Sequence, residues 1–394
     1  MARPIVLTSL LYPVLTAAFM AQLCFPVARI ATTYKSIELG LTAGAVVLIS
    51  ASFALFPAML AIPLGRIYDR GAVRRPMIVG ALMTPLALLL LRFEPSFFVM
   101  LLGGTILLGI VHGLVFSALQ LLVVRSAGRK HRDRVLGRLM IVFSVGGATG
   151  PFSIYVFERW GLPLGNSMLV LCLCVSVLMA TAVVFAARAV GNIRKRDDPP
   201  LTLGQLARTP RLLPVVILGS AFLTTQDLLL VFIPVLGHER GINAGVVGIM
   251  LGMQSVAGIV SRLFFVQLVE MLGRVKLLLV ASVVAAVSVV GIAFPAPIVV
   301  TGLCLCVAGM TLPLALTCSI ALVVQVAPPG GHATALSMRY AANRFAQFVV
   351  PLAASAVVSI IGIAGIFVAL GATLAVSAVG LSRTLSNLQP HRRK

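Results

Sequence analysis

Long apolar stretches alternate with short polar or basic segments along the whole chain. A helix needs about 20 apolar residues to cross the hydrocarbon core of a bilayer. The spacing of these stretches predicts twelve membrane-spanning helices. The expected spans are residues 6–28, 41–64, 76–92, 97–124, 139–157, 164–187, 213–236, 245–268, 276–294, 297–326, 336–360 and 363–382.

The most polar segment of the chain, residues 188–212, divides these spans into two sets of six. It contains the run Arg194-Lys195-Arg196-Asp197-Asp198. We therefore expect an all-α membrane protein with two pseudo-symmetric six-helix bundles. The bundles would be residues 1–187 and 213–394, joined by a cytoplasmic basic linker at 188–212.

Composition and charge agree with a membrane protein. The chain is 60% hydrophobic and only 10% charged, whereas about 25% of residues are charged in a typical soluble domain. The formal net charge of +21 does not require a nucleic-acid partner, because basic residues concentrate in cytoplasmic loops. With the N-terminus inside, only five of the 31 basic residues lie in outer loops, and both termini are cytoplasmic. Those five are Arg29, Lys35, Arg92, Arg159 and Arg240.

The short loops leave no room for a soluble domain and favour a multi-pass protein of a bacterial inner membrane. All six cysteines fall inside expected spans, without metal-site spacing. The histidines are scattered, and the chain lacks H-E-x-x-H, G-x-S-x-G and phosphate-loop motifs. A membrane-embedded enzyme is the competing class. We expect no enzyme activity, no metal and no cofactor, with the bilayer, a small molecule and protons as partners of a monomer.

Two loops in corresponding halves carry the same pattern when the sequence is shifted by about 201 residues. The first loop contains Gly65, Asp69, Arg70, Arg74 and Arg75. It resembles the signature loop of the major facilitator superfamily, although Ala72 replaces the usual second Gly. The second copy keeps Glu270, Gly273, Arg274 and Lys276, with Met271 in place of the expected Arg.

This resemblance implies a transporter that works by alternating access, with the two loops as a cytoplasmic gate. An acid at the end of the second span can pair with arginines or with a helix N-terminus. The alternative is that the basic residues serve only as topology anchors.

The fifth expected span contains Gly137, Gly146, Gly150 and Pro151. This pattern resembles the antiporter signature of the drug/proton branch of the superfamily, without its closing Gly pair. Small residues allow close helix packing, and proline leaves a helix bendable. The functional interpretation is a hinge that favours exchange, and the alternative is ordinary small-residue packing.

Ionisable residues inside spans are candidates for coupling. Asp227 is the one carboxylate well within an expected span, and His112 lies near the middle of the fourth span. A carboxyl group in apolar surroundings can bind and release a proton near neutral pH. We expect Asp227 to be the proton site, with His112 as its partner or as a second relay. The alternatives are a hydrogen-bonded structural acid and a packing histidine.

The family resemblance implies that the first, fourth, seventh and tenth spans line the cavity. Candidate cavity residues on them are Tyr12, Thr16, Gln22, Gln120, Gln226 and Thr311. No Arg or Lys is expected at mid-membrane depth in these spans, while Arg339 and Arg344 are expected to reach the cytoplasmic interface. The sequence therefore favours proton-coupled export of a small hydrophobic or cationic compound. The alternative is proton-coupled import of a small metabolite.

Overall fold

The computed structural model describes residues 4–69, 71–92, 97–126, 132–189, 209, 212–327 and 332–386. These residues form helices and connecting turns, and the chain divides into two compact units. The N-terminal unit comprises residues 1–197 together with 237–252, and the C-terminal unit comprises 198–236 and 253–394.

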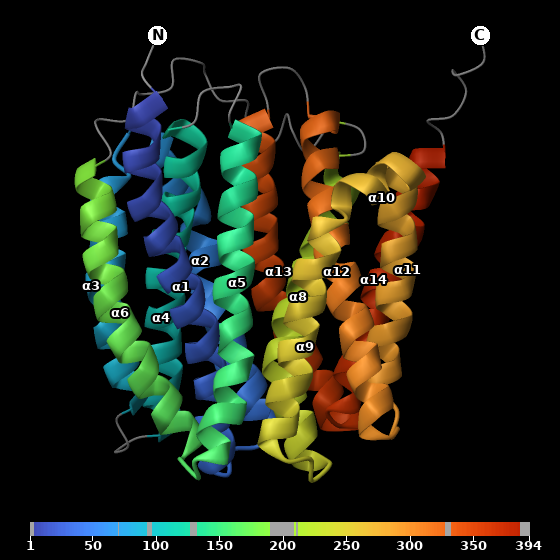
Figure 1. Cartoon of the computed structure of the whole chain (residues 1–394). Coiled ribbons are helices and arrows are strands. Elements are labelled where there is room, and N and C mark those ends of the chain that lie inside the picture. The colour runs from blue at the N-terminus through green and yellow to red at the C-terminus, as the bar shows by residue number, and fades with distance from the viewer. Residues whose placement is uncertain are drawn as a thin grey trace. The chain divides into compact units, whose positions relative to one another are not determined.

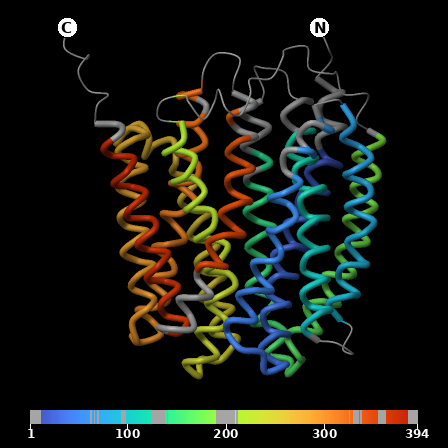
Figure 2. Tube along the Cα trace, turned by 180° about the vertical axis from the view of Figure 1, so that it is seen from behind, coloured from blue at the N-terminus to red at the C-terminus, as the bar shows by residue number. Residues whose placement is uncertain are grey.

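Six long helices form the N-terminal unit (Figure 1). They are α1 (Pro4–Glu38), α2 (Ala43–Asp69), α3 (Arg74–Arg92), α4 (Phe97–Ser126), α5 (Arg132–Arg159) and α6 (Leu164–Ala189). Within this unit α1 packs against α4, α5 and α6, and α3 packs against α4 and α6. Figure 2 shows α3 and α6 side by side.

The described residues of the second half of the chain form six long helices and one short one (Figure 1). They are α8 (Leu212–Glu239), α9 (Ala244–Leu263), α10 (Phe265–Leu272), α11 (Arg274–Ala293), α12 (Ile298–Val326), α13 (His332–Ile361) and α14 (Ala364–Ser386). Residues 237–252, which include the end of α8 and the start of α9, cluster with the N-terminal unit.

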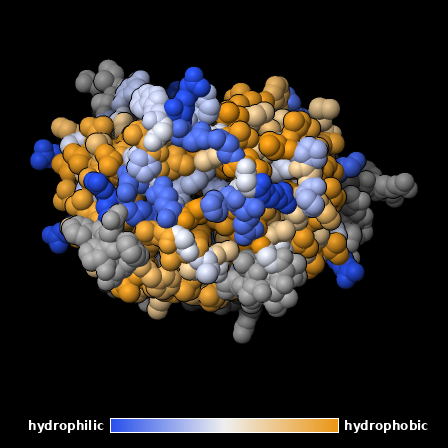
Figure 3. All heavy atoms as spheres, turned by 90° about the horizontal axis from the view of Figure 1, so that it is seen from below, coloured by the Kyte–Doolittle hydropathy of each residue, from blue (hydrophilic) through white to orange (hydrophobic). Residues whose placement is uncertain are grey.

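Twelve long helices match the twelve spans predicted from hydropathy. In the described part of the chain, eleven of them are long and apolar enough to cross a membrane. The remaining long helix, α13, has 30 residues and carries Arg339, Asn343, Arg344 and Gln347 between its first turns and its middle. Large apolar side chains are exposed along the helices, and Figure 3 shows many hydrophobic residues on the surface seen from below. This exposure is expected for helices that face lipid.

The two halves repeat one close helix contact. A side chain at Gly109 of α4 would collide with the backbone carbonyl of Phe53 of α2. A side chain at Gly309 of α12 would collide with the carbonyl of Gln254 of α9 in the same way. The two glycines are 200 residues apart in the sequence. Only glycine permits such close approach of two helix backbones, so the internal repeat is visible in the packing of each half.

The first span is longer than expected, because α1 continues to Glu38 rather than ending near residue 28. Arg29 and Lys35 were expected in an outer loop, and this was wrong: both lie within the helix. The Lys35 ammonium donates to Asn166 Oδ1 at 2.8 Å, and Glu38 Oε1 accepts from the Gly165 amide at 2.9 Å. These contacts with α6 allow charged residues to remain in the last turns of α1.

Candidate functional site

Asp227 lies in the middle of α8 and faces α13. Its carboxylate accepts a hydrogen bond from the Gln347 side-chain amide. The Arg344 guanidinium donates to Gln347 Oε1 at 3.0 Å and lies over the Tyr340 ring, 5.1 Å from its centroid. We call Asp227, Gln347, Arg344 and Tyr340 the Asp227 network. It links an acid, an amide and a cation inside the C-terminal unit.

The contacts between α8 and α13 follow one another in the same order along both helices. Nearer the start of each helix, Ser220 Oγ donates to Asn343 Oδ1 at 2.8 Å. Asp227 and Gln347 meet further along. At 1.5 Å per residue, Asp227 is roughly 22 Å from the start of α8. The Asp227 network therefore lies at a depth where an exposed charge on the lipid side would be costly.

A second arginine of α13, Arg339, is buried next to Gly219 of α8 and Ser319 of α12. The Nε and Nη2 atoms of Arg339 are buried and have no hydrogen-bond partner in the described structure. Arg339 and Arg344 are only 9% and 5% exposed. The expectation that these two side chains reach the membrane interface was therefore wrong. Neighbouring helices cover them instead.

His112 of α4 lies among aromatic side chains in the N-terminal unit. Its ring is 4.7 Å from Phe25, 5.3 Å from Phe53 and 5.2 Å from Phe116. The expected pairing of His112 with Asp227 stays a prediction, because the partners described for each residue lie within its own unit. Both aromatic and histidine rings can form the wall of an apolar site.

Arg29 joins this aromatic group from α1. Its guanidinium carbon lies 4.9 Å from the centroid of the Phe53 ring, a cation–π distance. Arg29 precedes the end of α1 by nine residues, so it lies roughly 14 Å inside the helix. Arg29 therefore lies within a helix and beside an aromatic ring, and the expectation that the first span has no basic residue at mid-membrane depth stays a prediction.

The first predicted gate loop forms a tight turn between α2 and α3. Gly65 lies within α2 and Asp69 is its last residue, while Arg74 and Arg75 begin α3. Arg70 lies outside the described residues. Gly71 has a φ of 88°, a conformation that glycine adopts readily.

The second predicted gate loop has a different structure. Glu270 lies in the short helix α10, Gly273 follows it with a φ of 76°, and Arg274 and Lys276 begin α11. The two copies of one sequence pattern therefore fold differently: the first lies at the end of a long helix and the second contains a helix of its own. The gating role of both copies stays a prediction.

All four predicted hinge residues, Gly137, Gly146, Gly150 and Pro151, lie in α5. A side chain at Gly146 would come within 2.9 Å of the Phe19 carbonyl of α1. One at Gly150 would approach Val27 to 3.2 Å. The hydroxyls of Thr149 and Ser153 donate to the Gly146 and Gly150 carbonyls. This part of α5 is therefore a close-packing site on α1, and its hinge role stays a prediction.

The predicted cavity residues have different surroundings. Tyr12 and Thr16 are exposed on α1, Gln22 lies beside Gly146, and Gln120 is half-buried on α4. The Thr311 hydroxyl donates to the Val307 carbonyl of its own helix. Gln226 is more informative: its buried Oε1 has no hydrogen-bond partner in the described structure, and neither has Thr224 Oγ1. Two polar atoms beside Asp227 are therefore unsatisfied.

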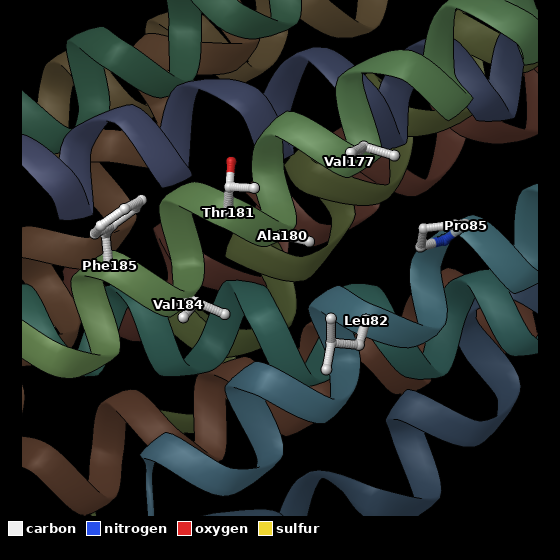
Figure 4. A pocket seen from close by; sticks show the side chains of 7 residues that line it. All are labelled: Leu82, Pro85, Val177, Ala180, Thr181, Val184 and Phe185. Carbon is white, nitrogen blue, oxygen red and sulfur yellow. The ribbon is translucent and has the colours of Figure 1, made fainter.

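An apolar pocket of about 360 Å³ lies between α3 and α6 (Figure 4). Its lining includes Leu82, Pro85, Val177 and Phe185. Thr181 is its hydroxyl-bearing residue, and that hydroxyl donates to the Leu178 carbonyl. Without a converging polar group, this pocket lacks the chemistry of a specific small-molecule site.

Among the described residues, no cluster of His, Cys, Asp and Glu could hold a metal ion.

Sequence reasoning found Asp227 but missed its partners. Gln347 and Arg344 follow Asp227 by about 120 residues, and no local motif connects them. The available signal was the polar content of α13, where Arg339, Asn343, Arg344 and Gln347 interrupt an apolar span.

Comparison with known proteins decides the family. The model of the Major Facilitator Superfamily matches residues 8–330 and, in a second match, residues 215–394. The chain belongs to the Major Facilitator Superfamily. This membership agrees with the signature loops and with the two halves of six spans.

Individual relatives of this superfamily member are distant. It is 25% identical over 214 residues to chloramphenicol efflux pumps of Mycobacterium tuberculosis, covering 53% of this chain and 50% of each relative. The match thus spans about half the length of these relatives.

Solved structures agree on the fold. A POT family transporter in complex with 5-aminolevulinic acid has a TM-score of 0.80 at 14% identity, with 96% of both chains covered. The nucleoside transporter NupG has a TM-score of 0.73 at 13% identity, with 95% of this chain and 99% of that chain covered. Family and fold are those of transporters of small molecules.

Proposed function

We propose that this chain is a proton-coupled transporter that exports a small hydrophobic or cationic compound in exchange for protons. Asp227 is the proton-binding residue of this mechanism. The observation that carries the proposal is the Asp227 network, which joins a carboxylate in the middle of a span to a cation through one amide. The match to chloramphenicol efflux pumps supports the export direction.

Protonation would change the bonding of this network. The Gln347 amide donates to the Asp227 carboxylate, and a hydrogen bond to an ionised acceptor is stronger than one to a neutral carboxyl group. Proton uptake therefore weakens the link between α8 and α13 and leaves the Arg344 charge less compensated. A conformational change that separates the two helices would then cost less in the protonated state. Coupling requires such a difference between the protonated and deprotonated states. A proton shifts the equilibrium between two conformations only if it binds one of them more tightly than the other.

The charges in this region favour a neutral compound over a cation. Two guanidinium groups, Arg339 and Arg344, accompany the carboxylate of Asp227 on α8 and α13. A cationic substrate would add to an excess of positive charge in surroundings of low dielectric constant. Neutral amphipathic molecules, chloramphenicol included, are therefore the first substrates to test.

The proposed setting is the inner membrane of a bacterium, with both termini in the cytoplasm and the protein acting as a monomer. The asymmetry of basic residues between alternate loops supports this orientation. Thiol-reactive reagents applied from each side to single cysteines placed in loops would test it.

The decisive experiment uses proteoliposomes with an imposed pH gradient. Wild type, Asp227→Asn and Glu239→Gln are compared with chloramphenicol and a panel of neutral and cationic lipophilic compounds. Glu239 is a matched control because it lies on α8 but is exposed at the end of the helix. We expect substrate-induced proton movement in the wild type and the control, and its loss in Asp227→Asn.

Each other result has a definite meaning. Full gradient-driven transport by Asp227→Asn would reject Asp227 as the proton site. Accumulation of substrate along the proton gradient, rather than against it, would replace export by proton-coupled import. No response to the panel by a folded protein would reject the hydrophobic and cationic substrate classes.

A further inference from the structure

The short helix α10 has an apolar face that the protein does not bury. Along Phe265–Leu272, the polar residues Gln267 and Glu270 are three positions apart and share one side of the helix. The other side carries apolar residues, yet no residue of α10 is buried. Opposite these polar residues lie Phe265, Leu268 and Val269, each partly exposed. Val266 and Met271, which are 60% and 79% exposed, lie on the two flanks of the helix, four positions from Glu270 and Gln267 respectively. An amphipathic helix needs an apolar environment for such a face.

The neighbouring helices set the depth of α10. The two spans that flank it, α9 (Ala244–Leu263) and α11 (Arg274–Ala293), have 20 residues each. At 1.5 Å per residue each is about 30 Å long, which equals the thickness of the hydrocarbon core. Both spans therefore cross the core with no excess length. Because α10 lies crosswise where α9 ends and α11 begins (Figure 1), it is level with the membrane interface.

The sequence repeat shows where the two loops differ. At an offset of 201 residues, Gly65, Arg70 and Gly71 of the first loop correspond to Val266, Met271 and Leu272. The acid is kept as Glu270, and the basic residue Arg75 is kept as Lys276. Each of the three replacements introduces a large apolar side chain, and all three side chains are exposed.

The exposed apolar surface of α10 continues onto the spans. Val256, Val260 and Leu263 of α9 are exposed apolar residues that lead towards Phe264, where α10 starts. Arg274 and Lys276, just beyond α10, are exposed basic residues. An apolar surface next to basic side chains is suited to a membrane leaflet that contains anionic headgroups.

We propose that α10 is an interfacial helix that inserts its apolar face into the membrane and that Arg274 and Lys276 bind anionic lipid headgroups there. The second copy of the signature loop is thus a lipid-binding element. This inference does not depend on proton coupling or on the identity of the substrate. The occupant of the surface is the leaflet itself, since the apolar residues continue the lipid-facing surface of α9.

Tryptophan quenching by brominated lipids tests the insertion. The chain has one tryptophan, Trp160, so a Trp160→Phe background needs a single change. Into it we introduce Phe265→Trp or Leu268→Trp on the apolar side, Gln267→Trp on the polar side, or Met271→Trp on the flank. In phosphatidylcholine–phosphatidylglycerol vesicles with bromine near the headgroup end of the chains, quenching at 265 and 268 should exceed that at 267 at least about twofold, since interfacial helices bury one face about 5–10 Å deep. Equal quenching at 265, 267 and 268 would overturn the insertion.

The same vesicles test the headgroup contact. With bromine on phosphatidylglycerol alone or on phosphatidylcholine alone, at equal mole fractions, the anionic lipid should quench the tryptophan at 271 more strongly. Arg274→Gln with Lys276→Gln should bring the two lipids to equal quenching. A preference that persists in this double variant would overturn the role of the two basic residues. No preference in the parent protein would overturn it as well.

Discussion

Two arginines on α13 should respond to the same substitution with opposite changes in stability. Arg339 and Arg344 are five residues apart, and both are at least nine-tenths buried. Arg344 donates to Gln347 and lies over Tyr340, whereas the Nε and Nη2 atoms of Arg339 have no partner in the described structure. We therefore compare Arg339→Met with Arg344→Met, because methionine keeps much of the apolar stem and removes the charge.

The magnitudes follow from the contacts. Each buried donor without a partner costs about 1–3 kcal/mol, so removing two of them relieves at most about 2–6 kcal/mol. Allowing for imperfect packing of the methionine, we expect Arg339→Met to stabilise the protein by about 2 kcal/mol. Arg344→Met loses a charged hydrogen bond of about 1.5–3 kcal/mol and a cation–π contact of about 0.5–2 kcal/mol. It should destabilise the protein by about 2–4 kcal/mol.

The assay is thermal unfolding in detergent, followed with a thiol-reactive dye. Cys24, Cys172 and Cys318 are free and buried, so they react as the protein opens. On the scale of about 2–4 °C per kcal/mol for domains of moderate size, Arg339→Met should unfold about 4–8 °C higher than wild type. Arg344→Met should unfold lower. An equal loss of stability in both variants would refute the claim that the unpaired donors of Arg339 destabilise the folded protein.

Three further substitutions test the packing. Gly109→Val should prevent folding, measured as loss of monodisperse protein, because the side chain meets the Phe53 backbone, whereas Gly103→Val on the same helix meets nothing within 4 Å and should fold. Lys35→Met should lower the free energy of unfolding by at least about 1.5–3 kcal/mol, since it removes a charged hydrogen bond to Asn166. Gly146→Val should lower the free energy of unfolding by about 1–3 kcal/mol, because the added side chain meets the Phe19 carbonyl of α1. Unchanged unfolding of Gly146→Val would contradict this close approach, and unchanged unfolding of Lys35→Met would contradict the hydrogen bond that it removes.

The spans could be predicted because each one corresponds to a continuous apolar segment of the sequence. The end of α1 could not, because Lys35 and Glu38 are charged residues that usually mark a boundary. Their partners, Asn166 and the Gly165 amide, are contributed by α6 and lie about 130 residues away. A helix can keep charges in its last turns when a distant helix provides hydrogen bonds, and hydropathy does not contain that information.

The candidate site was predictable only where one residue was exceptional by itself. Asp227 is a carboxylate inside an apolar span, which is rare enough to indicate function. Its partners on α13 depend on which faces of two helices meet. The short helix α10 was missed for another reason: its eight residues were assigned to a span and a loop, although Gln267 and Glu270 show a helical spacing within an apolar segment.

The internal repeat preserves positions at which helices pack closely but does not preserve the ionisable residues. Positions that match at an offset of 200 residues include Gly109 with Gly309 and Pro151 with Pro351. The two glycines occupy close backbone contacts in their respective halves. Such positions are shared because both halves must pack helices in the same way.

The ionisable residues behave in the opposite way. The same offset sets Val27 against Asp227 and Leu312 against His112, and both apolar partners are almost fully buried. Gln347 and Arg339 likewise correspond to Gly147 and Leu139. The acid, the amide and the buried cation of α8 and α13 therefore have no counterpart in the first half. Because a shared scaffold does not require them, and a buried charge is costly to keep, their presence in one half alone supports the proposal that Asp227 binds the coupling proton.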